Sequence, residues 1–466
     1  MWATRRWPAR CPSLASPSSA SNRPASRCTV KSTSLSRRRW RPTSRSAPCS
    51  TDCPGTSARQ SPCTTRRSPS TTVGLPRGGK SPPATAEFRS DPPRNRIMAH
   101  EPKLICDVHL DLAYNAIDFN RDLRWTQERI RRRELGMTDQ VFRGRNTVCF
   151  PEMRRGRVGL CVATQLARSV DYFSRMPGWL SPEQARAHTT GQLAWYREME
   201  ACGELVQIRC RGDLDRHLAA WLDAADDMPK TAAAGGLPIG YVLSLEGADS
   251  IVTFNHLEQS YADGLRALGP VHYGPGVYGM GTDAEGPLTP RGRDLLKELE
   301  RLGIILDVTH LCDESLRDAL DHYAGPLWAS HSNCRVLADW NRQFTDEQIR
   351  ELLDRGCVFG MAFDAIMMVS GWRHLQSSPR EFDLKIERIC DHIDHICQLA
   401  GNARHVGIGS DLDGGFGTEQ TPLDLDSIAD LGRIGGLLAA RGYSAADLDG
   451  FFHGNFVRFL RDHLPA

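Results

Sequence analysis

Short apolar runs alternate with amphipathic stretches along the chain from residue 103 onward. Apolar runs of about four to eight residues bounded by turn residues are typical of buried strands. Eight such runs occur, at 103–109, 157–165, 239–246, 271–275, 303–309, 326–330, 357–363 and 405–410. Eight alternating βα units predict an α/β fold, a distorted (β/α)8 barrel of the TIM type, rather than an open sheet.

Helix signals occupy the segments between these runs. Thr289 and Pro290 place a capping residue before a proline, and leucines at 295, 296, 299 and 302 follow at helical spacing. Thr345 and Gln348 predict a capping box. A long insert at about 166–237 is predicted to be mostly helical, with a flexible connection at 231–236.

Residues 1–97 differ in composition from the rest of the chain. They hold 19 Lys and Arg against 3 Asp and Glu, with many Ser and Pro residues. Such a segment cannot bury a core, so it is predicted to be a disordered basic extension. A transit peptide and a polyanion-binding tail are alternatives. We favour a third interpretation, in which Met98 is the true start, because the first strand begins five residues later.

The remaining residues, 98–466, form the predicted barrel and are acidic, with 39 Lys and Arg against 53 Asp and Glu. This balance does not favour nucleic-acid binding. No apolar run of about 18 residues is present, so no membrane association is expected. Ten cysteines without a Cys-x-x-Cys pair, several inside strand runs, favour buried free thiols and a cytoplasmic location.

Candidate chemistry begins at the end of the first predicted strand, in Asp107-Val-His109-Leu-Asp111. Alternate residues of a strand point the same way, so His109 and Asp111 project together. Nitrogen and oxygen donors at this spacing are suited to a divalent metal.

Later strand ends carry matching groups, namely Glu246, His310, His331 and Asp411. Barrel active sites are built at the carboxyl ends of the strands, so these side chains are expected to converge. Glu246 follows a mainly apolar strand, and burying a carboxylate is costly unless it is paired or bound to metal. Two metals can hold a hydroxide between them, and Asp411 is placed to move its proton. The predicted reaction is metal-assisted hydrolysis of an amide.

Five ordered motifs, from Asp107–Asp111 through Leu245–Gly247, Asp307–His310 and Ser330–Ser332 to Gly409–Gly414, resemble the zinc membrane dipeptidase (renal dipeptidase) family of the amidohydrolase superfamily. The resemblance implies two Zn²⁺ ions per chain. It implies that one ion is held by His109, Asp111 and Glu246 and the other by Glu246, His310 and His331. It further implies Asp411 as the proton-transfer residue, Arg342 as the residue that binds the substrate carboxylate, and a homodimer.

The same resemblance indicates one departure, because better-studied members have a histidine just after strand four. In the stretch 271–279 the aligned place is taken by Val277, so His272 or Tyr278 is suggested as a substrate-binding substitute. Leu112-Ala113-Tyr114 also replaces the usual Leu-Pro.

The sequence therefore predicts a zinc-dependent dipeptidase, a metallopeptidase acting on small peptides with a free carboxylate. Alternatives are a related amidohydrolase acting on N-acyl amino acids, lactones or cyclic amides, and a metal-binding pseudoenzyme. The Gly274-x-Gly276-x-x-Gly279 pattern is interpreted as an active-site loop, since Pro275 lies inside it and no helix follows. His392 and His395 are expected on a solvated or capping helix face rather than at a metal.

Overall fold

The computed structural model describes residues 101–172, 174, 176–224 and 236–466. The predicted extension at 1–97, the proposed start at Met98 and residues 231–235 of the predicted connection lie outside the described residues. No helix among the described residues is long and apolar enough to cross a membrane.

The described strands form one parallel sheet. They are β1 (Ile105–Leu110), β2 (Val158–Leu166), β3 (Leu205–Gln207), β4 (Ile239–Glu246), β5 (Leu265–Gly269), β6 (Ile305–Asp307), β7 (Leu327–Trp328), β8 (Phe359–Met361) and β9 (Val406–Ile408). Eight of them follow the order β7-β6-β5-β4-β2-β1-β9-β8. An isolated parallel bridge between Ala329 and Phe359 joins β7 to β8, so the eight strands nearly close into the predicted barrel.

The distortion of this barrel comes from β3, which lies within the predicted helical insert. It pairs with Ile239–Tyr241 of β4, whereas β5 pairs with Leu243–Glu246 on the same edge of β4. The insert is otherwise helical as predicted, with α4 (Pro182–Ala201) and α5 (Arg211–Asp223).

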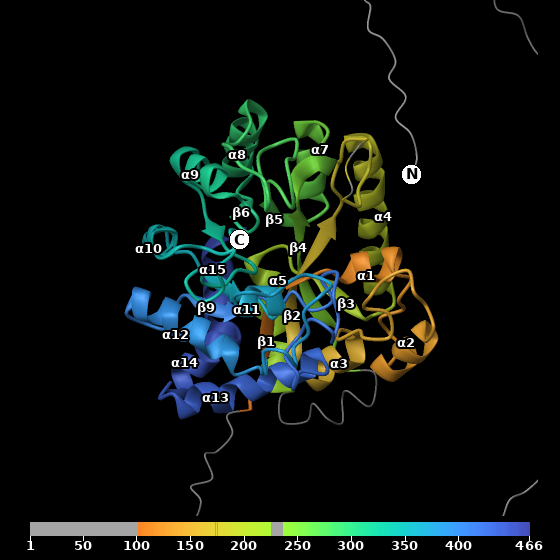
Figure 1. Ribbon diagram of the computed structural model, residues 1–466. Helices are drawn as coiled ribbons and strands as arrows, with labels where there is room; N and C mark the ends of the chain where they lie inside the picture. Colours follow the sequence, from red (N-terminus) through yellow and green to blue (C-terminus); the bar gives the residue numbers. More distant parts are fainter. Residues whose placement is uncertain (1–100, 173, 175, 225–235) are drawn as a thin grey trace, which may run out of the picture. The chain divides into compact units, whose positions relative to one another are not determined.

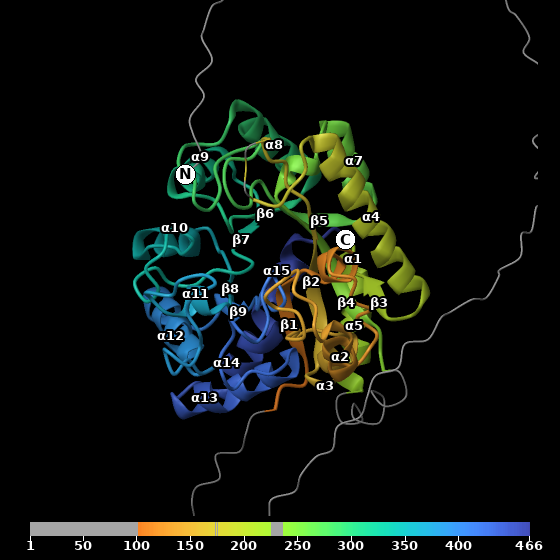
Figure 2. The same ribbon diagram turned by 45° about the vertical axis from the view of Figure 1, so that its right-hand side comes forward.

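Helices surround the strands, as Figures 1 and 2 show for α4, α7, α8, α9, α10 and α12. Besides α4 and α5, the helices are α1 (Leu112–Asp118), α2 (Gln127–Glu134), α3 (Phe150–Arg155), η2 (Ala248–Ser250), α7 (Phe254–Ala262), α8 (Pro290–Leu302), α9 (Asp313–His322), α10 (Asp346–Asp354), α11 (Ala365–Met368), α12 (Arg388–Ala400), η3 (Ile428–Arg433), α13 (Ile434–Ala440), α14 (Ala445–Asp449), η4 (Gly450–Gly454) and α15 (Asn455–His463).

The helix signals in the sequence match the observed ends. Thr289 caps α8 by accepting the Gly292 N–H, and Thr345 with Gln348 forms the predicted capping box of α10. Leu295, Leu296 and Leu299 of α8 are buried. Amphipathic helices of this kind cover a sheet whose strands are buried on both faces, and β1, β2 and β4 are buried along their whole length.

The position predicted for the fourth strand, which is β5 in the structure, is wrong. The strand runs over Leu265–Gly269, and the predicted run at 271–275 lies in the loop that follows it. Pro270 has no N–H to donate, so it does not continue the ladder beyond Gly269. This shift changes which residues stand at the carboxyl end of the strand.

The C-terminal helix lies at the amino-terminal end of β9. The Asn455 side-chain amide donates hydrogen bonds to the carbonyl oxygens of Ala403 and Val406, at 2.8 and 2.7 Å. The opposite, carboxyl-terminal end of the strands is therefore left open for the polar residues that follow them.

Candidate metal centre and active site

Glu246, the last residue of β4, stands at the centre of the polar residues that follow the strands. Its Oε1 atom lies 3.1 Å from His310 Nε2, 3.5 Å from His331 Nε2 and 3.6 Å from His109 Nε2. Asp111 Oδ1 lies 3.9 Å from His109 Nε2. The five side chains that the sequence assigned as metal ligands thus come together from β1, β4, β6 and β7, and all are buried.

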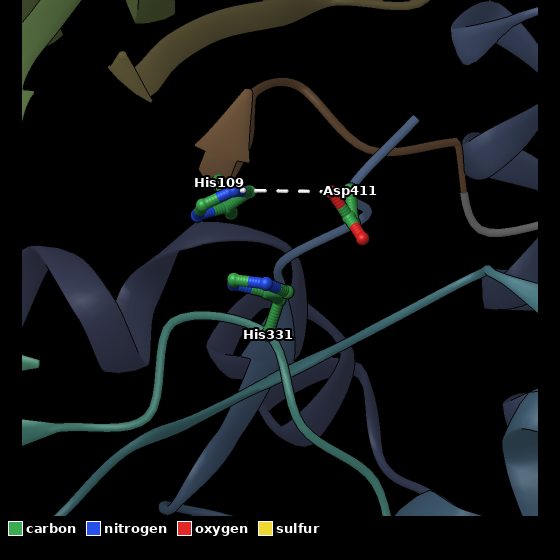
Figure 3. Close-up of side chains that lie close together, drawn as sticks. All are labelled: His109, His331 and Asp411. Carbon is green, nitrogen blue, oxygen red and sulfur yellow. Dashed lines mark ion pairs between the residues drawn. The ribbon is translucent and has the colours of Figure 1, made fainter. Parts of the chain in front are cut away.

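Figure 3 shows how Asp411 joins this group. Its Oδ1 atom lies 3.8 Å from His109 Nε2, and the imidazole rings of His109 and His331 are 3.6 Å apart between centroids. Asp411 and His310 both have a positive φ, 58° and 70°. Backbone of this kind is uncommon for residues other than glycine and gathers at functional sites.

Hydrogen bonds from neighbouring hydroxyls orient the imidazoles. Thr282 Oγ1 lies 2.9 Å from His310 Nδ1, and Ser330 Oγ lies 2.8 Å from His331 Nδ1 and 3.3 Å from His109 Nδ1. Because each Nδ1 atom is engaged in this way, each Nε2 atom is left facing Glu246. This is how ligand histidines are held in protein metal sites.

Two buried atoms of the cluster lack a partner that a bound metal ion would supply. His109 Nε2 and Glu246 Oε2 have no hydrogen-bond partner among the residues that the structure describes. Orphaned polar atoms are costly in an interior, and a divalent cation would satisfy both. The nitrogen and carboxylate donors suit zinc, so the residues present fit the metal that the sequence implies.

Burial also sets the protonation states in this cluster. It lowers the pKa of His109 to about 3 and the pKa values of His310 and His331 well below the usual value, so the imidazoles are neutral and able to bind metal. Burial, followed by the nearby Asp111 carboxylate, raises the pKa values of Glu246 and Asp411. A bound cation would offset the cost of keeping these carboxylates charged.

His272 also belongs to this group. Its Nε2 atom lies 3.6 Å from Glu246 Oε1, and its ring centroid is 4.3 Å from that of His310. His272 is one of the two residues suggested from the sequence as a substitute for the family histidine, and the structure brings it to the cluster. Because β5 ends at Gly269, His272 follows the strand by three residues and reaches the metal-ligand cluster, whereas Val277 lies farther along the loop.

Arg342 and Tyr278, the other predicted substrate-binding residues, lie in different surroundings. Arg342 is buried at the site, where its guanidinium donates to Ser332 Oγ at 2.9 Å and to the His331 carbonyl at 2.8 Å. The buried Tyr278 hydroxyl instead donates to the carbonyl oxygen of Ile251. Tyr278 does not line the cavity that the described residues form at the cluster.

That cavity has a volume of about 550 Å³ and is partly open. Glu246, His272, His310, His331 and Asp411 contribute to its wall, and its size suits a small organic ligand. Sequence reasoning did not assign further lining residues to the site. They are Tyr114 of α1 and four residues outside helices and strands, Arg168, Tyr273, Trp340 and Asp364.

Comparison with known proteins identifies the family to which this site belongs. Residues 95–464 match the model of the membrane dipeptidase family, peptidase family M19. The chain belongs to this family. It is accordingly a hydrolase of the metallopeptidase class, in agreement with the family resemblance and the buried cluster of metal-ligand groups.

Curated relatives agree with this membership of the membrane dipeptidase family. An uncharacterized protein in the pqqA 5' region of Klebsiella pneumoniae is 34% identical over 289 residues, which cover 60% of this chain and 92% of that protein. The Claviceps purpurea protein named dipeptidase tcpJ is 28% identical over 216 residues, or 45% of this chain and 44% of the relative.

Solved structures share the fold. A metallopeptidase of family M19 named dipeptidase AC is 24% identical with a TM-score of 0.60, covering 78% of this chain and 99% of the other. A metallopeptidase from Rhodobacter sphaeroides, solved with a phosphinate mimic of the dipeptide L-Ala-D-Ala, is 22% identical with a TM-score of 0.57. It covers 78% of this chain, and its whole length is matched.

Proposed function

We propose that this protein is a two-zinc dipeptidase that hydrolyses the amide bond of small peptides with a free carboxylate. The observation that carries the proposal is the convergence on Glu246, where one carboxylate oxygen lies within 3.6 Å of the Nε2 atoms of four imidazoles, three of which belong to predicted metal ligands. A carboxylate in this position is able to bridge two metal ions.

The donors divide into two sets. His109 and Asp111 would hold one ion with Glu246, and His310 with His331 would hold the other with the same carboxylate. When bound, a zinc pair lowers the pKa of a water molecule towards about 7 and polarises a carbonyl group.

Asp411 supplies the proton transfer in this proposal. It lies at the edge of the cavity beside His109, so it can accept a proton from the attacking water and pass it to the leaving amine nitrogen. Its raised pKa, caused first by burial, suits a group that must hold that proton between the two steps.

Arg342 and His272 position the substrate. The Arg342 guanidinium lines the cavity and still has donors beyond its bonds to Ser332 and His331, so it can bind the substrate carboxylate. His272 lies beside Glu246, where an imidazole N–H can donate to the oxygen of the scissile amide. The solved Rhodobacter sphaeroides neighbour, which carries a dipeptide mimic, supports a substrate of this size.

Metal removal and restoration tests the proposal. We expect hydrolysis of Ala-Ala by the purified protein to stop after dialysis against a chelator and to return with added Zn²⁺. N-acetylalanine, a lactone and a cyclic amide in the same panel report the alternative amidohydrolase activities. Full dipeptide hydrolysis by metal-free protein, or no hydrolysis of any dipeptide by protein carrying two zinc ions, would refute the proposal.

A further inference from the structure

Arg168 places a second guanidinium in the active-site cavity. It follows β2 by two residues, lines the same cavity as Arg342 and is mostly buried. In contrast to Arg342, its guanidinium makes no hydrogen bond or ion pair with any residue in the described part of the chain. A cation removed from water without a partner is costly, and burial lowers the pKa of Arg168 for this reason.

The backbone around Arg168 is held in place. The Arg168 carbonyl accepts the N–H of Trp179 at 2.9 Å, and the Val170 N–H donates to the Trp179 carbonyl at 2.8 Å. The stem of the side chain packs against Gly178, where an added Cβ would lie 2.9 Å from Arg168 Cγ. Arg168 is therefore a positioned cation rather than a freely moving surface residue.

The carboxylates that act on Arg168 electrostatically do not form ion pairs with it. Asp249 uses one oxygen to accept the Ser169 N–H at 2.8 Å and the other to accept the Val277 N–H at 2.9 Å. Glu246, which also acts on Arg168 electrostatically, belongs to the metal-ligand cluster. The negative charge that would pair with the Arg168 guanidinium must therefore come from a molecule bound in the cavity.

The topology places Arg168 and Arg342 on opposite sides of the barrel mouth. Arg168 follows β2 and Arg342 follows β7, and these two strands are four places apart in the ring of eight, whichever way it is followed. Three of the strands that carry the predicted metal ligands, β6, β4 and β1, lie between β2 and β7 in this ring. A dipeptide whose carboxylate is bound by Arg342 therefore extends its N-terminal residue towards Arg168.

We propose that Arg168 is a specificity-determining residue that binds an acidic side chain on the N-terminal residue of the substrate. The substrate class is then dipeptides with Asp or Glu at the first position. This inference rests on the proposed dipeptidase function and adds the substrate class to it. A second carboxylate would supply a charge-assisted hydrogen bond that a neutral side chain of the same shape does not.

Glu-Ala and Gln-Ala provide the test, because their first residues differ in charge and hardly in shape. We expect the zinc-loaded protein to prefer Glu-Ala by about tenfold or more in kcat/KM. In Arg168→Gln this ratio should fall to about one, and Arg168→Lys should restore part of it. Arg342→Gln should instead lower kcat/KM for both peptides. Arg404→Gln, an exposed arginine before β9 at the other end of the barrel, is the matched control.

Binding provides a second readout that does not depend on turnover. Calorimetry with phosphinate analogues of Glu-Ala and Gln-Ala should show the same tenfold preference in the zinc-loaded protein, lost in Arg168→Gln. Metal content and the thermal unfolding midpoint of each variant establish that the site is intact. The inference is overturned if Arg168→Gln lowers kcat/KM equally for both peptides. It is also overturned if the wild-type ratio of kcat/KM for Glu-Ala to that for Gln-Ala is one or less. If either result is found and Gln-Ala is still hydrolysed, the proposed dipeptidase function is retained. If neither peptide is hydrolysed, the result contradicts both the dipeptidase function and the role of Arg168.

Discussion

The carboxylate of Asp107 on β1 accepts two hydrogen bonds from Ser410, one from its backbone N–H at 2.9 Å and one from its hydroxyl. It also accepts the N–H of His109 at 3.2 Å. Asp107 therefore holds together the ends of β1 and β9, and with them the predicted metal ligand His109 and the neighbouring Asp411.

The same arrangement occurs on the other side of the cluster. Asp307 on β6 accepts the N–H of Thr309 and the N–H of Ser330, which follows β7, both at 3.1 Å. In each case an aspartate of one strand accepts the N–H of the serine that stands two residues after another strand, so buried carboxylates outside the cavity lining help to place the predicted ligands.

Replacing Asp107 with Ala should destabilise the protein. Three buried donors would lose their acceptor, at about 1 kcal/mol or more each, so we expect the free energy of unfolding to fall by about 3 kcal/mol in urea titrations. Ser410→Ala removes one of these donors and should cost less. Equal losses in the two variants would show that Asp107 does not join the strands in this way.

Glu246→Gln should change metal content more than any other single substitution at the site. The amide has no second anionic oxygen to bridge two ions, so we expect the content to fall from two zinc ions to one or fewer per chain, measured by atomic emission. Asp413→Asn is the matched control. Its buried carboxylate accepts the N–H groups of Thr147 and Val148 at 2.8 and 3.0 Å, so this variant should lose stability and keep its metal.

Asp411→Asn should separate proton transfer from metal binding. Asparagine tolerates the positive φ of 58° at this position, so the backbone is expected to stay in place. We expect kcat for dipeptide hydrolysis to fall by about 10²–10⁴-fold while zinc content is retained. A variant with normal kcat would remove Asp411 from the mechanism.

His392 should make stability depend on pH. The prediction of a solvated or capping position was wrong, because His392 is fully buried on α12 and bonded to the Cys334 N–H at 3.2 Å and the Met368 carbonyl at 3.1 Å. Burial lowers its pKa from 6.5 to about 4. Between these values the unfolded chain binds a proton that the folded protein does not, so stability falls as the pH is lowered through this window.

The size of this stability change follows from the shift in the pKa of His392. Its contribution to the free energy of unfolding should fall by about 2 kcal/mol between pH 7 and pH 5. Urea titrations of zinc-loaded wild type and His392→Gln at both pH values measure the difference, since the other histidines titrate alike in both proteins. An identical decrease in the two proteins would contradict the assignment.

The sequence by itself determined the barrel and which polar side chains meet at its mouth. Alternation of strand and helix patterns is a local property, and side chains that end parallel strands must meet at one edge of the sheet. The predicted ligands His109, Asp111, Glu246, His310 and His331, and the predicted proton-transfer residue Asp411, could therefore be chosen without coordinates.

Only the tertiary structure decided what surrounds these ligands. The apolar run after Pro270 resembled a strand locally, yet pairing with β4 and β6 selected Leu265–Gly269 instead, which brought His272 to the cluster. Arg168 reached the cavity from a loop whose path depends on contacts with the distant residues Trp179 and Asp249. Periodicity encodes which segments are strands and helices, whereas the course of loops depends on non-local contacts that no local pattern records.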